Sequence, residues 1–148
     1  MLKLIKNTLF YVGIIMLLTA CNDSPKDNGM GEFLPVEKAF VFSVKAGEGD
    51  NLIAHWEIEE GYHLYRDKFE FSIEGSDYQI SALNMPKGEM ILDKVFGEQE
   101  SYSGSLDVNI ALKAVKNSGT ATLKTTYQGC SDRGLCYPPQ NITSVIEL

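Results

Sequence analysis

Two cysteines five residues apart, Cys130 and Cys136, are the residues of this sequence best suited to chemistry. They lie in the stretch TYQGCSDRGLCYPP, between a strand-like run and a double proline. A cysteine pair can form a structural disulfide, bind a metal ion or exchange electrons with the thiols of another protein. Gly129 and Gly134 relax the backbone here, so the two β-carbons can reach the roughly 3.8 Å separation of a disulfide.

Metal binding is the weakest of these three interpretations. The pair offers only two thiolates, whereas a structural zinc site needs four ligands. The two histidines, His55 and His63, lie far upstream in the sequence without a paired spacing. We therefore expect no metal and no bound cofactor.

The other two interpretations stay open on the residues alone. A disulfide is the ordinary state of a cysteine pair in an exported protein. Closing a loop of only seven residues removes little entropy from the unfolded chain, however, and stabilises the fold by about 2.4 kcal/mol. A small loop at the edge of a β-sandwich can also present its sulfurs to the thiolate of a partner.

The elements that must position these cysteines are short strands. Apolar residues alternate with polar ones, and clusters of glycine, asparagine and aspartate separate the runs. This pattern predicts an all-β fold of seven to nine strands, an immunoglobulin-like antiparallel β-sandwich, with a small barrel as the alternative. Trp56 is in register with one apolar face and is expected in the core. The runs include Phe40 to Val44, Leu52 to Ile58, Phe69 to Ile73, Leu106 to Leu112, Ala121 to Tyr127 and Ile142 to Leu148.

The first residues predict export. Residues 1–20 have two lysines, an apolar core too short to span a bilayer and a small-residue exit, as in a signal peptide. The segment Leu-Thr-Ala-Cys resembles a bacterial lipobox, so we expect lipid attachment at Cys21 and a flexible tether over residues 21–31. One domain should occupy residues 32–148. Asn22 after the cysteine favours the outer membrane over the inner one.

Charge excludes some partners. Without residues 1–20 the chain keeps 11 basic and 20 acidic residues, a net charge of −9. Nucleic acids and anionic lipid surfaces both require a basic patch. We therefore expect no nucleic-acid partner, and membrane contact through the lipid anchor alone.

Four motifs together resemble the N-terminal periplasmic domain of the DsbD family. They are FLPVEKAFVFSV, WEIEEGYHLYRDK, DKVFGEQESY and the cysteine stretch, and they occur in the same order over nearly all of residues 32–148. The resemblance implies an immunoglobulin-like domain with a reversible disulfide. It also implies a thioredoxin-like domain or a DsbD/CcdA-type membrane protein as electron donor. Implied acceptors are periplasmic disulfide isomerases and thioredoxin-like proteins of cytochrome c maturation.

The resemblance also assigns roles to the two cysteines. Cys136 matches the residue that attacks the partner's disulfide, and Cys130 matches the one that resolves the mixed disulfide. Asp132 lies inside the loop of an acidic protein, and negative charge disfavours a thiolate. We therefore expect a poorly reactive thiol until a partner docks.

A second family feature is a cap loop over the cysteines. Here the cap would consist of residues 93–97, with Phe96 as the shield and Gly97 as a hinge. Val95 stands where the family commonly has an aromatic residue, which leaves open which side chain covers the sulfurs. Without the resemblance, these residues, which begin at Asp93, would read as an ordinary connection with Phe96 filling a gap in the core.

His63 departs from the family pattern, which usually has a tyrosine at this position. It should lie beside Tyr65 on one strand face, where a histidine can pair with a thiolate and change its charge near neutral pH. The alternative is a surface histidine with no role. The chain ends at Leu148, directly after its last predicted strand, so we expect the relay domain alone, supplied with electrons by a separate protein.

Overall fold

The predicted alternation of apolar residues produces two facing sheets. The computed structural model describes residues 32–75, 77–115 and 119–148, and Phe33–Leu148 form one unit. The predicted signal peptide, the lipid-attachment site at Cys21 and the tether lie outside the described residues. One facing sheet has the order β1 (Phe40–Ala46), β2 (Asn51–Ile58), β8 (Ser105–Ala114), β5 (Tyr78–Asn84), and the other β11 (Gln140–Glu147), β9 (Thr120–Tyr127), β4 (Glu70–Glu74).

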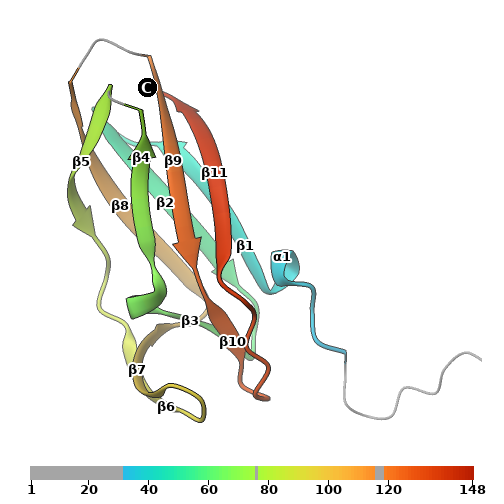
Figure 1. Cartoon of the computed structure of the whole chain (residues 1–148). Coiled ribbons are helices and arrows are strands. Elements are labelled where there is room, and N and C mark those ends of the chain that lie inside the picture. Colours follow the sequence, from blue (N-terminus) through green and yellow to red (C-terminus); the bar gives the residue numbers. More distant parts are fainter. Residues whose placement is uncertain (1–31, 76, 116–118) are drawn as a thin grey trace, which may run out of the picture. The chain divides into compact units, whose positions relative to one another are not determined.

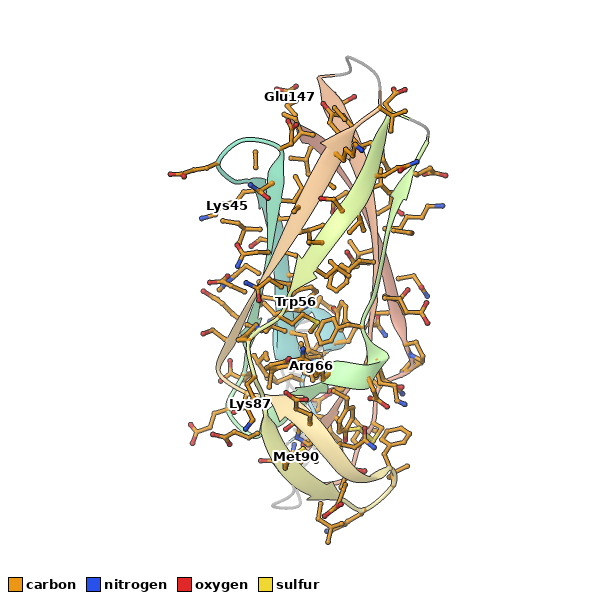
Figure 2. All side chains as sticks on the ribbon, turned by 90° about the vertical axis from the view of Figure 1, so that its left-hand side faces the viewer. Lys45, Trp56, Arg66, Lys87, Met90 and Glu147 are labelled. Carbon is orange, nitrogen blue, oxygen red and sulfur yellow. A yellow bond between two sulfur atoms is a disulfide. The ribbon has the colours of Figure 1, made fainter. Side chains whose placement is uncertain are left out.

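The core between these sheets is aromatic. Trp56 on β2 is fully buried. Its ring centroid lies 4.7 Å from that of Phe42, 5.0 Å from that of Phe69 and 5.7 Å from that of Tyr127. Figure 2 shows Trp56 in the middle of the domain, between the layers. This contact between elements confirms the predicted antiparallel sandwich and the core position of Trp56.

A third sheet closes one end of the sandwich. It lies at the end away from the C-terminus (Figure 1). All its strand pairs are antiparallel. A single helical turn, α1 (Val36–Ala39), precedes β1, and a 3-10 turn, η1 (Arg66–Lys68), follows the second strand of this sheet. The order in the sheet is β10 (Gly129–Ser131), β3 (Tyr62–Tyr65), β7 (Gly97–Tyr102), β6 (Glu89–Asp93).

The end sheet explains why the sequence predicts too few strands. The described residues contain eleven strands instead of seven to nine. All four residues of β3 are buried, so that strand has no exposed face and no alternation of burial. The hairpin of β6 and β7 is largely polar or exposed. Neither of the two helical turns in this part of the chain is long enough to cross a membrane.

Candidate functional site

Cys130 and Cys136 form a disulfide on the outermost strand pair of the end sheet. Cys130 lies on β10, and an isolated β-bridge to Cys136 folds the loop back on this strand, with the two Cα atoms 4.0 Å apart. Cys130 is 1% exposed, whereas Cys136 is half-buried. The two sulfurs therefore differ in access, and an approaching thiolate meets Cys136 first.

Close packing at Gly129 holds the cysteine strand in place. A β-carbon at this position would lie 2.5 Å from the carbonyl oxygen of His63 and 2.5 Å from the ring of Phe40. Only glycine allows β10 to approach β3 this closely. The register that follows places Cys130 directly opposite His63.

A chain of hydrogen bonds runs from the cysteine loop across β3. Asp132 Oδ1 lies 2.8 Å from Nδ1 of His63, and Nε2 of the same ring lies 2.9 Å from the hydroxyl of Tyr65. The Tyr65 hydroxyl donates to Oδ2 of Asp93 at 2.7 Å. Side chains from β3, from β6 and from the turn after β10 thus form one network beside the disulfide. His63 and Tyr65 lie on β3, Asp132 lies in the turn after Cys130, and Asp93 lies at the start of the predicted cap.

Asp93 also builds the turn that carries the cap. Its Oδ1 accepts the backbone N–H groups of Val95 at 2.7 Å and Phe96 at 2.8 Å, an arrangement typical of an aspartate-initiated turn. Gly97 ends the turn with a φ of 77°, a conformation that other residues rarely adopt. The predicted cap residues therefore form the tight turn between β6 and β7.

Within this turn, Phe96 points inward and Val95 points outward. The Phe96 ring makes an edge contact with the ring of Tyr65, with the centroids 5.3 Å apart. Nζ of Lys68 lies over the face of the Phe96 ring, 5.1 Å from its centroid. Val95 is 63% exposed, and Phe96 is not among the residues of the described core. Phe96 is half-buried against the fully buried Tyr65, and its role as the shield of the sulfurs stays a prediction.

Burial and charge shift the ionisation of the network. Burial alone would raise the pKa of Asp93, but hydrogen bonds from Tyr65 and from the Phe96 and Val95 amides, together with the charge of His63, lower it below the ordinary value. The pKa of Tyr65 is raised far above its usual range, first by burial and then by its bond to the Asp93 carboxylate. Asp93 is therefore ionised, and Tyr65 keeps its proton.

Three residues at this site are of types that bind metals. One donor atom each from His63, Asp93 and Cys130 lie within 4.8 Å of one another. The sulfur is already used in the disulfide, and the Tyr65 hydroxyl bonds to both other groups. This oxidised arrangement does not fit a metal ion, and the expectation of no bound metal stays a prediction.

The structure brings together every site residue that the sequence singled out in the described part of the chain. The alternative of a surface position for His63 is wrong, because the end sheet covers this side chain to 7% exposure. A hollow of about 490 Å³ lies beside His63 and Asp132, and its other lining residues include Glu59, Glu60 and Glu89.

Two further features of the site were not predicted from the sequence. Lys68 contacts the cap ring from η1, and exposed apolar side chains flank the cap on the edge strand β6. Met90 is 65% exposed and Leu92 is 81% exposed. Figure 2 shows Met90 on the hairpin at the end of the molecule. The two side chains give this edge strand an exposed apolar face.

Comparisons with known proteins agree with this site. The family model for "Thiol:disulfide interchange protein DsbD, N-terminal" matches residues 31–147. Thiol:disulfide interchange protein DsbD 1 of Pseudomonas aeruginosa is 37% identical over 110 residues, which cover 74% of this chain and 18% of that protein. DsbD of Salmonella typhimurium is 37% identical over 115 residues, covering 78% and 19%. The chain spans about a fifth of the length of these relatives.

Two solved structures share the fold. The reduced DsbD N-terminal domain of Neisseria meningitidis is 33% identical, with a TM-score of 0.69 over 77% of this chain and 89% of that one. The complex between the DsbD and PilB N-terminal domains from the same organism gives 30% identity and a TM-score of 0.62, over 77% and 87%. In both comparisons the fold and the sequence are similar over 77% of this chain.

Proposed function

The chain belongs to the family of DsbD N-terminal domains, and from this premise we propose that it relays electrons between periplasmic proteins through a reversible Cys130–Cys136 disulfide. The observation that carries the proposal is the unequal access of the two sulfurs beside a capped turn. Cys136 is half-buried at the surface, and Cys130 lies beneath it on β10. Cys136 therefore has the more accessible sulfur, the one that a partner would reach.

The electron balance of the relay has two halves. A donor thiolate attacks Sγ of Cys136, the disulfide breaks, and Cys130 leaves as a thiolate that takes a proton. The second donor thiol then releases Cys136, so two electrons enter the domain. In the second half, the Cys136 thiolate attacks a client disulfide, and Cys130 attacks Cys136 to release the reduced client.

The partners follow from the family. We propose a thioredoxin-like domain or a DsbD/CcdA-type membrane protein as donor, and disulfide isomerases or thioredoxin-like proteins of cytochrome c maturation as acceptors. The Neisseria complex, in which a DsbD N-terminal domain is bound to the PilB N-terminal domain, supports docking with another protein domain. The exposed side chains of Met90 and Leu92 provide apolar area for such docking.

Location and access control complete the proposal. Export and lipid attachment at Cys21 would hold the domain in the periplasm, with the outer membrane favoured. Phe96 would shield the disulfide in the free protein and move aside when a partner docks. Its contacts with Tyr65 and Lys68 support a closed turn that has a modest cost of opening.

A trapping experiment tests the function. The Cys130→Ser variant, mixed with an oxidised thioredoxin-like protein, should accumulate a mixed disulfide through Cys136, because the resolving thiol is absent. The matched Cys136→Ser variant should trap little, since Cys130 is buried. If the native disulfide stays oxidised at a redox potential of about −300 mV and neither variant forms an adduct, the bond is instead structural, in a non-catalytic binding lipoprotein.

A further inference from the structure

His63 faces the buried cysteine from the neighbouring strand. The two residues are direct partners in the antiparallel register of β3 and β10. One ring nitrogen of His63 lies within 4.8 Å of the Cys130 sulfur. The His63 side chain is 9% exposed, so little water screens the space between them. A charge on this ring therefore acts strongly on a charge on that sulfur.

The hydrogen-bond partners of His63 determine how many protons it carries. Asp132 has a 66% exposed side chain, and its carboxylate oxygen accepts a hydrogen bond from Nδ1 at 2.8 Å. Tyr65 has a single proton, which it donates to the ionised Asp93. The Tyr65 oxygen therefore accepts from Nε2 at 2.9 Å. Both ring nitrogens carry hydrogen.

We propose that His63 is an imidazolium in the oxidised protein and serves as the counter-charge and proton partner of the Cys130 thiolate. This inference rests on the proposed electron relay. It gives the buried resolving sulfur what the acidic surroundings of the site do not, a positive charge within 4.8 Å. A neutral ring would instead turn a nitrogen lone pair toward the Asp132 carboxylate or toward the Tyr65 oxygen.

The proton balance of the opening step follows from this assignment. A donor thiolate forms a bond to Sγ of Cys136, the disulfide breaks, and the electron pair goes to Cys130. The imidazolium stabilises this thiolate and transfers a ring proton to it, which leaves a neutral ring that takes up a proton from solvent through the hollow beside it. In the closing step the neutral ring accepts the Cys130 proton as Cys130 attacks Cys136.

Other ionisable groups around His63 set the direction of its pH response. Asp132, Asp93 and Tyr65 contact or adjoin the ring from three elements, and Cys130 faces it from β10. The remaining titratable side chains in the adjoining hollow are Glu59, Glu60 and Glu89. The assistance to Cys130 is present at low pH and is lost as pH rises and the ring loses its proton.

Reduction of the disulfide by dithiothreitol tests this response. The rate, divided by the thiolate fraction of the reagent, should fall about tenfold from about pH 5 to about pH 10 in the native protein. An opposite charge at this distance lowers a thiol pKa by roughly one to three units, and leaving-group rates follow only part of such a shift. In the His63→Gln variant the corrected rate should be flat and equal to the native rate at high pH.

His55 provides a matched control. It lies on β2 in another sheet and also pairs with an aspartate, with Nδ1 2.7 Å from Oδ1 of Asp107. The His55→Gln variant should keep the native pH profile. A flat profile in the native protein, or the same profile in His63→Gln, would overturn the proposal.

A measurement on the native protein covers the case in which His63→Gln does not fold. Nitrogen-15 NMR of the histidine rings in the oxidised protein should show both His63 nitrogens protonated at neutral pH. A neutral His63 ring would overturn the assignment. If either His63 test fails while Cys130→Ser still traps partners through Cys136, only the His63 assignment is rejected. If trapping fails while His63 is protonated, only the electron relay is rejected.

Discussion

Removing the Phe96 ring should make the disulfide more reactive toward small thiols. The ring lies against Tyr65, next to the network that joins the cap turn to His63, the strand partner of Cys130. Phe96→Ala leaves the turn itself in place, because Asp93 bonds to backbone amides and not to the ring. The substitution therefore weakens the closed position of the cap without removing its frame.

The magnitude follows from two contacts. An edge contact between aromatic rings contributes about 0.5–1.5 kcal/mol. The contact with Nζ of Lys68, 5.1 Å from the ring centroid, contributes about 0.5–1 kcal/mol. Together they favour closure by about 1–2.5 kcal/mol. If only the open form reacts, the reduction rate should rise by roughly 5- to 70-fold.

The assay is reduction by dithiothreitol, quenched with an alkylating agent and followed by mass spectrometry. Val95→Ala is the matched control, since Val95 occupies the same turn with a 63% exposed side chain, and its rate should stay native. Unfolding in urea, followed by the fluorescence of Trp56, should show that both variants remain folded. A native rate in Phe96→Ala would show that the ring does not govern access, and a slower rate would reverse the reasoning.

Three further substitutions probe other parts of the site. Asp93→Asn should lower the free energy of unfolding at neutral pH. Because the pKa of Asp93 is lowered in the folded state, its stabilisation is present above the unfolded value, near 3.8, and is lost as pH falls through the folded value. Urea melts of the native protein and of the variant should therefore differ at neutral pH and converge only in acid. Leu92→Lys should slow exchange with a protein partner at least fivefold and leave the dithiothreitol rate unchanged, with Val145→Lys on β11 as the exposed control; equal slowing in both would remove the role of β6. Gly129→Ala should destabilise the fold by about 1–3 kcal/mol in urea, and a native melt would contradict the close approach of β10 to His63.

The sandwich could be predicted because its strands have one buried face. In β2, Leu52, Ala54 and Trp56 are buried and their neighbours are less so, which is the pattern that alternation detects. The end sheet lacks this signal. Tyr62 to Tyr65 are all buried, since β3 lies between β10 and β7 and is covered on both faces.

The site was predictable in its residues but not in its connections. Spacing alone placed His63 and Tyr65 on one strand face, and their hydrogen bond agrees with it. Asp132 and Asp93 reach the same network from positions 69 residues after His63 and 28 residues after Tyr65. Nothing local in the sequence encodes such contacts, because they depend on the pairing of β10 with β3 and of β6 with β7 in the end sheet.

The attachment of the β6–β7 hairpin has a consequence for engineering. β6 pairs with β7 alone, and β7 joins the rest of its sheet through only two register pairs, Leu64 with Tyr102 and Tyr65 with Ser101. The hairpin therefore forms a separable unit that contains β6 and the turn at residues 93–97, while the disulfide lies on β10 and in the loop that follows it. Swapping residues 89–102 between relatives should redirect the choice of partner without rebuilding the redox centre.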